Sequence, residues 1–184
     1  MRRVFVALEI PEEFRVKIEE LRKTRYIKDD LNWEPLEKLH LTLKFIGDCD
    51  ENVIAEIEEQ LDTLAELPAI KTSFTKFGNF QRNRIPSILW VGLEATEELK
   101  NLQHQIEKKL GEIGIIEETR PYLPHITLLR VKTPVGPKFI GRFVQCEIPK
   151  EEFMCPHLVL YQSKLLQGGS VYVPLKTVML RSSD

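Results

Sequence analysis

The chain has 184 residues, of which 42% are hydrophobic and 29% charged, with a formal net charge of −2 and a pI near 6.1. This length is enough for one domain with a sizeable core, or for two small lobes that share an interface. The charge argues against a protein that coats long nucleic acid through its overall field, while a nucleic-acid end or a nucleotide held locally stays compatible with it.

Membrane and secreted classes are excluded by the apolar pattern. No apolar run is long enough to span a bilayer, and Glu9 interrupts the apolar stretch near the amino terminus, so no signal peptide is predicted. We expect a soluble, cytoplasmic protein with no membrane partner. The three cysteines, Cys49, Cys146 and Cys155, include no Cys-x-x-Cys pair, so neither a disulfide framework nor a zinc site is predicted.

The apolar residues predict strands and helices in alternation. Gly47 is expected to end the second strand, residues 81–86 to turn the chain between the third and fourth, and Gly168 with Gly169 to turn it before the last. Short connections between neighbouring strands favour antiparallel pairing, so the fold class is predicted as α+β rather than doubly wound. The strands are expected over residues 4–10, 39–46, 70–80, 87–93, 125–131, 154–163 and 170–180.

Three helices are expected between these strands. The first opens at Pro11, the second is capped by Asp50 and closed by Pro68, and the third is capped by Thr96. Each carries apolar residues three or four positions apart, which predicts one face packed against the sheet. A stretch rich in proline and glycine follows the fifth strand, with Pro134, Gly136 and Pro137.

One tetrapeptide occurs twice: His40-Leu41-Thr42-Leu43 returns as His125-Ile126-Thr127-Leu128. Side chains alternate faces along a strand, so the His and Thr of each copy point to one side while their apolar neighbours point into a core. Each copy therefore presents an imidazole and a hydroxyl about 7 Å apart along its strand. Packing alone accounts poorly for a repeated His-x-Thr, so the two copies are expected to be halves of one active site.

The copies stand 85 residues apart, and the same offset aligns residues 4–9 with residues 89–94. This repetition predicts duplicated strand-helix-strand units within a single bilobal domain, residues 1–184. An approximate two-fold axis would bring the two His-x-Thr strands to face each other. The predicted fold is thus two pseudo-symmetric lobes with mostly antiparallel sheets around a central cleft. The aligned strands share Val6 with Val91, Leu8 with Leu93 and Glu9 with Glu94, and Phe5 aligns with Trp90.

Paired histidines suit the cleavage of a phosphodiester. Histidine titrates near neutral pH, so one imidazole accepts a proton from water or a hydroxyl while the other, protonated, donates one to the departing oxygen. The Thr42 and Thr127 hydroxyls suit the non-bridging oxygens of the phosphate. The motifs supply too few ligands for a metal, and no Gly-rich phosphate loop indicates ATP, so no metal or other cofactor is expected.

The segments around both motifs follow a family pattern: Trp33, residues 39–47, residues 89–92, residues 120–130, and Tyr161, Ser163, Gly169 and Tyr172 in the tail. With the two motifs, they resemble the two-histidine (2H) phosphoesterase superfamily, and within it the RNA 2′,3′-cyclic phosphodiesterases, also called 2′-5′ RNA ligases. The resemblance runs from Val4 to about Leu180, and all four motif residues match.

The resemblance implies an enzyme that opens a 2′,3′-cyclic phosphate to a 2′-phosphomonoester and reversibly joins RNA ends through a 2′-5′ linkage without ATP. Carried over, His40 is the proton donor and His125 the proton acceptor for hydrolysis; the approximate symmetry leaves the opposite polarity open. Thr42 and Thr127 hold the phosphate. The implied partners are RNA ends or nucleotides with a 2′,3′-cyclic phosphate, and we expect a monomer.

Three further residues are candidates for substrate contacts. Arg130, two positions past Leu128 and taken to lie on the cleft side of its strand, is expected to bind phosphate; a plain surface charge is the competing interpretation. Phe45 stands at the corresponding place in the first copy. Phe45 and Trp33 are candidates for stacking on a base, and both also suit core packing.

A second function stays open, that of a catalytically idle module that binds nucleotides or RNA. A binding module has no need of a matched acid and base, so the intact His40 and His125 favour the enzyme.

Overall fold

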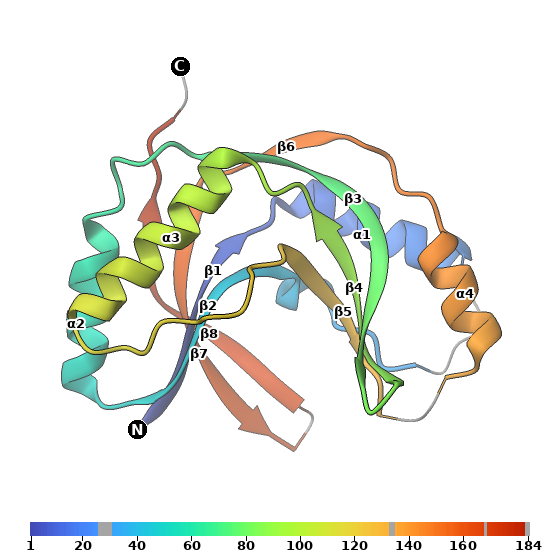
Figure 1. The fold of residues 1–184 in the computed structure, drawn as a ribbon, viewed down its shortest axis with the longest axis horizontal. Coiled ribbons are helices and arrows are strands. Elements are labelled where there is room, and N and C mark those ends of the chain that lie inside the picture. Colours follow the sequence, from blue (N-terminus) through green and yellow to red (C-terminus); the bar gives the residue numbers. More distant parts are fainter. Residues whose placement is uncertain (26–30, 133–134, 168, 183–184) are drawn as a thin grey trace.

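The computed structural model describes residues 1–25, 31–132, 135–167 and 169–182 (Figure 1). Within this part of the chain, no helix is long and apolar enough to cross a membrane. The elements are, in order, β1 (Arg2–Glu9), α1 (Glu12–Arg25), the short 3₁₀ helix η1 (Leu36–Lys38), β2 (His40–Cys49), α2 (Glu51–Asp62), β3 (Ile70–Arg82), β4 (Ile85–Leu93), α3 (Glu97–Glu112), β5 (His125–Arg130), α4 (Pro137–Gln145), β6 (Glu152–Cys155), β7 (His157–Leu166) and β8 (Gly169–Met179).

The eight strands form one curled sheet in the order β6-β3-β4-β5-β2-β1-β7-β8, and the neighbouring strands are antiparallel. The predicted α+β class is thereby confirmed. The order is symmetric about the β5–β2 pair, with β4 and β1 next to it, then β3 and β7, then β6 and β8. Helices α2 and α3 lie together on one side, and α4 lies beside β3 on the other (Figure 1).

The two halves of the sheet meet where β2 pairs with β5. In the described residues these strands are joined at Leu41 and Ile126, which stand 85 residues apart and are both fully buried. Farther out, Thr42 pairs with Ala7 of β1, and Thr127 pairs with Trp90 of β4. Ala7 and Trp90 stand 83 residues apart, so the outer strands are two residues out of step with the offset of 85. A shift of two residues preserves which face each side chain occupies.

Gly47 bends β2 rather than ending it. Its φ of +104° lies in the region that favours glycine, and it pairs with Val4 where the register shifts between Val4 and Phe5. This is the geometry of a β-bulge, which kinks a strand without terminating it. The strand consequently continues to Cys49, three residues beyond the predicted end.

Helix α4 occupies the place where the sequence shows a stretch rich in proline and glycine. Gly136 is its N-cap and Pro137 its first residue, a position where the missing N–H of proline costs no hydrogen bond. Phe143 is buried and attaches the helix to the core. Pro134 of the Pro/Gly-rich stretch and Gly168 of the predicted last turn lie outside the described residues.

The turn between β3 and β4 is shorter than predicted. The strands run to Arg82 and from Ile85, which leaves Asn83 and Arg84 as the turn. Both turn residues have positive φ, 53° and 64°, as a two-residue type I′ hairpin requires.

The predicted caps are confirmed. Asp50 and Thr96 precede α2 and α3, and their side-chain oxygens accept hydrogen bonds from the N–H groups of Val53 (3.0 Å) and Leu99 (3.3 Å). The one strand predicted over residues 154–163 is instead two, β6 and β7, because the intervening proline cannot donate to a strand ladder.

Trp90 of β4 lies across Gly78 of β3, its partner in the strand pairing. A Cβ atom at Gly78 would stand 2.3 Å from two carbons of the indole ring. Trp90 is itself buried, so the ring has no free space to move into. Only glycine therefore fits at this position.

The Gly78→Ala variant is expected to lower the free energy of unfolding by about 1–3 kcal/mol, because the added methyl overpacks the sheet. Gly141→Ala is the control: it lies inside α4, and apart from its chain neighbours and the backbone of its own helix no atom is within 4 Å of the added Cβ. Alanine there should stabilise the helix by roughly 0.5–1 kcal/mol. Urea unfolding of both variants measures the difference, and equal midpoints would contradict the close contact at Gly78.

Candidate active site

The four motif side chains gather at the junction of β2 and β5. Leu41 and Ile126 pair across it and are buried, while the residues on either side of them, His40, Thr42, His125 and Thr127, are half-buried on the other face. Continuing the antiparallel register by one residue each way sets His40 opposite Thr127 and Thr42 opposite His125. Opposite Cβ atoms then stand about 5 Å apart, and the two histidines, which are diagonal neighbours, about 7–8 Å apart.

Both imidazoles are held in the same way. The Nδ1–H of His40 donates to the carbonyl oxygen of Lys38 (2.6 Å), and the Nδ1–H of His125 donates to that of Leu123 (2.7 Å). A carbonyl oxygen only accepts, so Nδ1 carries the hydrogen and the neutral ring presents a lone pair at Nε2. The Thr42 hydroxyl donates to Nε2 of His40 (3.1 Å). The two rings therefore offer two basic nitrogens to one face.

Both histidines are neutral at pH 7. Burial lowers the pKa of His40 to about 4, opposed by the hydrogen bond to Lys38, and the charges of Arg130 and of a protonated His125 lower it further. Burial also lowers the pKa of His125, again with help from Arg130. The charge of Arg130 thus acts on both rings.

The position of Arg130 depends on a bulge that the sequence does not reveal. Strict alternation from His125 would place Arg130 on the same side as Leu128, toward the core. Alternation therefore does not support the predicted position of Arg130 on the cleft side. In the structure Leu128 and Leu129 are both buried, the β4–β5 register shifts, and Arg130 is exposed. The irregularity turns Arg130 to the histidine face.

Arg130 is held by an acid that the sequence analysis missed. Its Nε lies 3.6 Å from Oε1 of Glu34, and burial raises the pKa of the Tyr172 hydroxyl, which Arg130 opposes. The backbone N–H of Glu34 donates to the carbonyl of Leu128 (2.7 Å), which ties the segment before η1 to β5. No motif marks an acid that comes from a loop, so only the fold identifies Glu34.

Aromatic side chains surround His40. The Phe5 ring centroid lies 5.0 Å from the imidazole, Tyr172 meets it edge-on at 5.2 Å, and Tyr161 lies at 6.1 Å. Phe45, which is 63% exposed, stacks on Phe5 at 6.5 Å. A second β2 bulge, like that of β5, turns Phe45 outward after two consecutive buried residues. Phe45 therefore lies at the edge of the site, available to a planar ligand.

The environment of His125 is similar. Phe80 meets its ring edge-on at 4.9 Å, and Trp90 lies at 6.1 Å. Phe5 and Trp90 are aligned by the 85-residue offset, and each contacts the histidine of its own half. That aligned pair was the sequence signal for the aromatic walls, whereas nothing marked Phe80.

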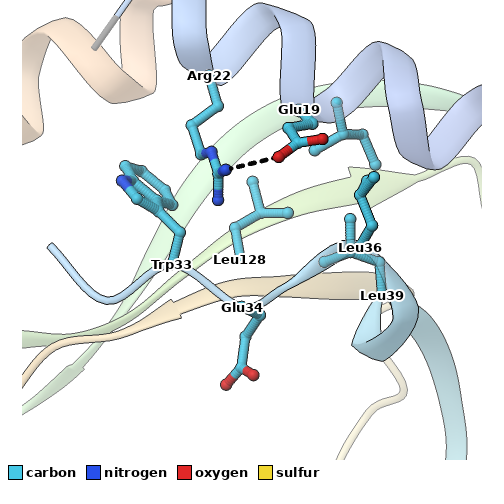
Figure 2. Close-up of a pocket in the computed structure, with 8 residues that line it drawn as sticks. Glu19, Arg22, Trp33, Glu34, Leu36, Leu39 and Leu128 are labelled. Carbon is cyan, nitrogen blue, oxygen red and sulfur yellow. Dashed lines mark hydrogen bonds and ion pairs between the residues drawn. The ribbon is translucent and has the colours of Figure 1, made fainter. Parts of the chain in front are cut away.

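Trp33 does not join this group. Its ring packs 6.1 Å from Phe143 and 6.5 Å from Phe139 of α4, and the Arg22 guanidinium covers it at 5.7 Å. It borders a small pocket between α1 and β5, from which the Glu34 carboxylate points away (Figure 2). The pocket is also lined by Leu128, on the core side of β5. The structure thus gives Trp33 packing contacts, and the predicted base stacking stays a prediction.

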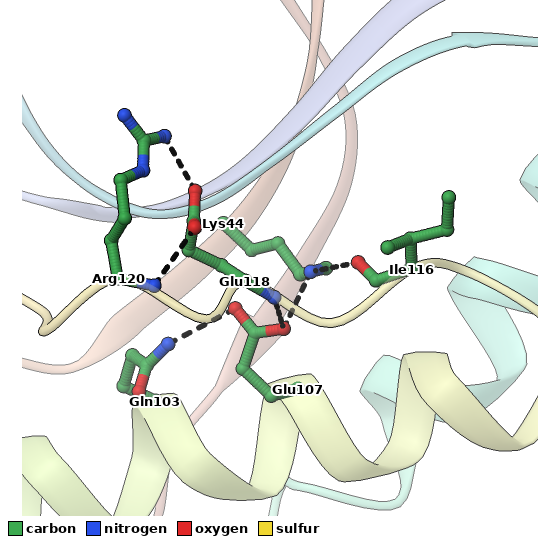
Figure 3. Close-up of polar contacts among 6 residues, drawn as sticks. All are labelled: Lys44, Gln103, Glu107, Ile116, Glu118 and Arg120. Atoms are coloured by element: carbon green, nitrogen blue, oxygen red, sulfur yellow. Dashed lines mark hydrogen bonds and ion pairs between the residues drawn. The ribbon is translucent and has the colours of Figure 1, made fainter.

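A buried ion pair holds residues 113–124, the segment that leads into β5 (Figure 3). Lys44 of β2 and Glu107 of α3 lie 2.5 Å apart, with side chains only 3% and 9% exposed. Lys44 also donates to the carbonyl of Ile116 (2.9 Å), and Glu107 accepts from the N–H of Glu118 (3.1 Å). Each member of the ion pair thus binds the segment as well as its partner.

The end of the segment reaches the site itself. The Tyr122 hydroxyl donates to the carbonyl of Thr42 (3.0 Å), and burial raises the pKa of Tyr122 above its usual range. The next residue, Leu123, supplies the carbonyl that orients His125. The segment therefore connects the strand of His40 to the ring of His125 by a path separate from the pairing of β2 with β5.

The family model of the 2′-5′ RNA ligase superfamily matches residues 10–165. The chain belongs to this superfamily. Relatives named RNA 2′,3′-cyclic phosphodiesterase extend over nearly all of it. The one from Thermotoga maritima is 31% identical over 175 residues, 92% of this chain and 91% of the relative. The one from Escherichia coli is 29% identical over 182 residues, 95% of this chain and 94% of the relative. The predicted membership of the RNA 2′,3′-cyclic phosphodiesterase family is confirmed.

Solved structures show the same fold. The crystal structure of a Thermus thermophilus protein, TT0787, matches with a TM-score of 0.83 at 26% identity, over 99% of this chain and 100% of that one. E. coli LigT, crystallised with 3′-AMP, has the same fold, with a TM-score of 0.78 at 24% identity over 97% of this chain and 98% of that one.

The buried ion pair allows a test by double substitution. Lys44→Met is expected to lower the free energy of unfolding by about 3–5 kcal/mol, because it leaves the Glu107 carboxylate buried without its cation. Lys44→Met with Glu107→Met should recover much of that loss. The control is the exposed pair Lys100 and Glu97, 2.6 Å apart, where Lys100→Met should cost less than about 1 kcal/mol. Equal effects in urea unfolding at both pairs would contradict a structural role for Lys44.

The lowered pKa of His40 predicts acid sensitivity of the fold. The pKa is about 4 in the folded protein and near 6.5 for an unperturbed histidine, so between these values the unfolded chain binds more protons. Stability from this group is complete above pH 6.5 and is lost as the pH falls toward 4. Since the ring is partly exposed, we expect a loss on the order of 1–2 kcal/mol.

Urea unfolding at about pH 7 and about pH 5 measures this loss. His40→Asn should reduce the pH dependence, whereas His104→Asn, on the exposed side of α3, should leave it unchanged. A His40→Asn protein with the full pH dependence would contradict the assignment.

Proposed function

We propose that this protein hydrolyses 2′,3′-cyclic phosphates of RNA ends or nucleotides to 2′-phosphomonoesters, by acid–base catalysis with His40 and His125 and without a metal ion. The observation that carries the proposal is the matched pair of imidazoles on one face. Each ring has Nδ1 bound to a carbonyl, so Nε2, which in His40 also meets the Thr42 hydroxyl, is the nitrogen available for chemistry. The names of the T. maritima and E. coli relatives support the same substrate.

In the proposed reaction, Nε2 of His125 accepts a proton from a water molecule whose oxygen attacks phosphorus. The bond from phosphorus to O3′ breaks, and a proton on Nε2 of His40 passes to O3′. The product is a 2′-phosphomonoester. Accepting a proton requires a neutral imidazole and donating one requires a protonated imidazole, so the reaction uses two histidines.

His40 must be protonated to act as the donor, and in the empty site it is neutral at pH 7. A cyclic phosphodiester carries a negative charge, and a negative charge beside an imidazole raises its pKa. Bound substrate therefore favours the protonated ring. The opposite assignment makes His125 the donor, and the lowered pKa of His40 in the empty site favours it. The experiment below distinguishes the two assignments.

The phosphate is proposed to lie among the four motif side chains. The Thr42 and Thr127 hydroxyls donate to its non-bridging oxygens, and the Arg130 guanidinium supplies a charge-assisted hydrogen bond. To bind phosphate, Arg130 exchanges its contact to Glu34, which at 3.6 Å is long for a hydrogen bond. Phe45 is proposed to stack on a base, because it is exposed at the edge of the same face.

Joining of RNA ends follows from the same groups. If the 5′-hydroxyl of a second RNA replaces water, His125 accepts its proton and the product is a 2′-5′ phosphodiester. The energy comes from opening the cyclic phosphate, so ATP is not consumed. All the named groups belong to one chain, and we propose that a monomer is active.

The test is a short RNA with a 2′,3′-cyclic phosphate end, incubated with the protein in excess chelator. His40→Ala and His125→Ala are each expected to lower kcat by at least about a hundredfold, since each removes an acid or base. His104→Ala is the matched control and should keep the unmodified rate, because His104 is exposed on α3. The 2′-phosphate is measured by chromatography, and adding an RNA with a 5′-hydroxyl tests joining.

The result separates the two candidate functions. If the purified protein binds the RNA end but does not open it, the catalytically idle binding module is the better description. The two histidine roles separate with a substrate that has sulfur at the 3′ position. A thiolate departs without a proton, so this substrate should restore the rate of the variant that lacks the acid, and not that of the variant that lacks the base.

A further inference from the structure

Positive charge is concentrated in one half of the fold. Residues 70–93 and 119–146 contain nine Lys and Arg and no Asp or Glu. The whole chain has 26 Lys and Arg and 28 Asp and Glu, so the remainder carries 17 cations and 28 anions. The two segments form β3, β4, β5 and α4, which are neighbours in the fold. The net charge of −2 thus conceals a basic half and an acidic half.

Some of these cations are engaged by acids from elsewhere. Lys71 pairs with Glu152 (2.6 Å) and Arg120 with Glu118 (2.5 Å), and Arg130 reaches Glu34. Five others are exposed and form no ion pair with any described residue. Two of them are Lys76 and Lys138. The remaining three, which we call the rim cations, are Arg82, Arg84 and Lys132.

The rim cations extend the site outward along the strands. Arg82 is two residues past Phe80, whose ring contacts His125. The register shift between Phe80 and Gln81 leaves its extra residue on β4, so alternation along β3 sets Arg82 on the same face as Phe80. Arg130 pairs with Ile88, and from there β4 continues four residues, about 13 Å, to Arg84 in the turn. Lys132 follows Arg130 at the end of β5. The rim cations therefore continue a path that begins at His125 and passes Arg130.

The geometry of the turn does not explain why position 84 is an arginine. Arg84 has a φ of 64°, where a residue with a Cβ is strained by roughly 1–2 kcal/mol and glycine is favoured. Its side chain makes no hydrogen bond or ion pair within the described residues that would offset this strain. An arginine held there at a cost to the hairpin is consistent with a ligand outside the chain.

We propose that the RNA strand that precedes the terminal phosphate lies along β5, β4 and the β3–β4 turn, with its backbone phosphates bound by the rim cations. The proposal rests on the proposed function, since it takes the terminal phosphate to lie at His40 and His125. A strand of RNA presents phosphates at regular intervals, which a row of unpaired cations matches. A mononucleotide is too short to reach the turn, so the protein prefers an oligonucleotide.

The test compares two substrates that share one reacting group: a mononucleoside 2′,3′-cyclic phosphate and a ten-nucleotide RNA with the same end. The variant is Arg82→Gln with Arg84→Gly, in which the glycine relieves the strained φ and so protects the fold. The ratio of kcat/KM for the oligonucleotide to that for the mononucleotide should fall about tenfold, through KM. The slope of log kcat/KM against log salt for the oligonucleotide should become shallower by about 1.4, for two lost phosphate contacts.

The matched control is Lys108→Gln with Arg181→Gln, two exposed cations outside the basic half. An unchanged ratio in the Arg82→Gln, Arg84→Gly protein, or an equal fall in the control, would overturn the proposal. If the unmodified protein opens neither substrate, the proposed function fails instead. The rim cations are then tested by fluorescence anisotropy with a 3′-phosphorylated RNA. The same variant should bind this RNA about tenfold more weakly than the unmodified protein. An equal affinity would overturn the proposal.

Discussion

The site depends on the pairing of β2 with β5. Leu41 and Ile126 meet there in the core, and because side chains alternate along strands, this buried contact sends His40, Thr42, His125 and Thr127 to the opposite face. A slip of one residue would bury all four polar groups. The hydrophobic effect at this one pair therefore specifies where the reactive groups lie, although neither Leu41 nor Ile126 has any chemistry of its own.

The pairing of β2 with β5 is short, and polar contacts between the two halves of the fold stabilise it further. The carbonyl of Thr42 and the ammonium of Lys44, both from β2, hold the segment that delivers His125. Burial also lowers the pKa of each imidazole, so packing influences the proton chemistry of the site. The strand order and the 85-residue separation of Leu41 and Ile126 agree with a duplicated unit, which stays a prediction.

The features that depend on neighbouring residues in the chain could be predicted from the sequence. The caps at Asp50 and Thr96 and the repeated His-x-Thr were identified because short-range rules determine them. The rest comes from tertiary packing. The bulges that turn Phe45 and Arg130 outward depend on strand partners, and the contact from Glu34 joins a loop to a distant strand. For Trp33 the sequence left core packing and base stacking both open, because a flanking aromatic residue has no periodic pattern that distinguishes a core position from a ligand contact.

The shared tautomer of the two histidines has a consequence for turnover. Each Nδ1 is occupied by a carbonyl, so each ring exchanges protons only at Nε2. In the proposed hydrolysis one ring loses a proton and the other gains one, so the protonation states of the two rings after the reaction are the reverse of those before it. An enzyme in that state is poised to run the chemistry backward. It returns to its starting state only when solvent moves one proton from ring to ring, so this transfer must take place between one forward reaction and the next.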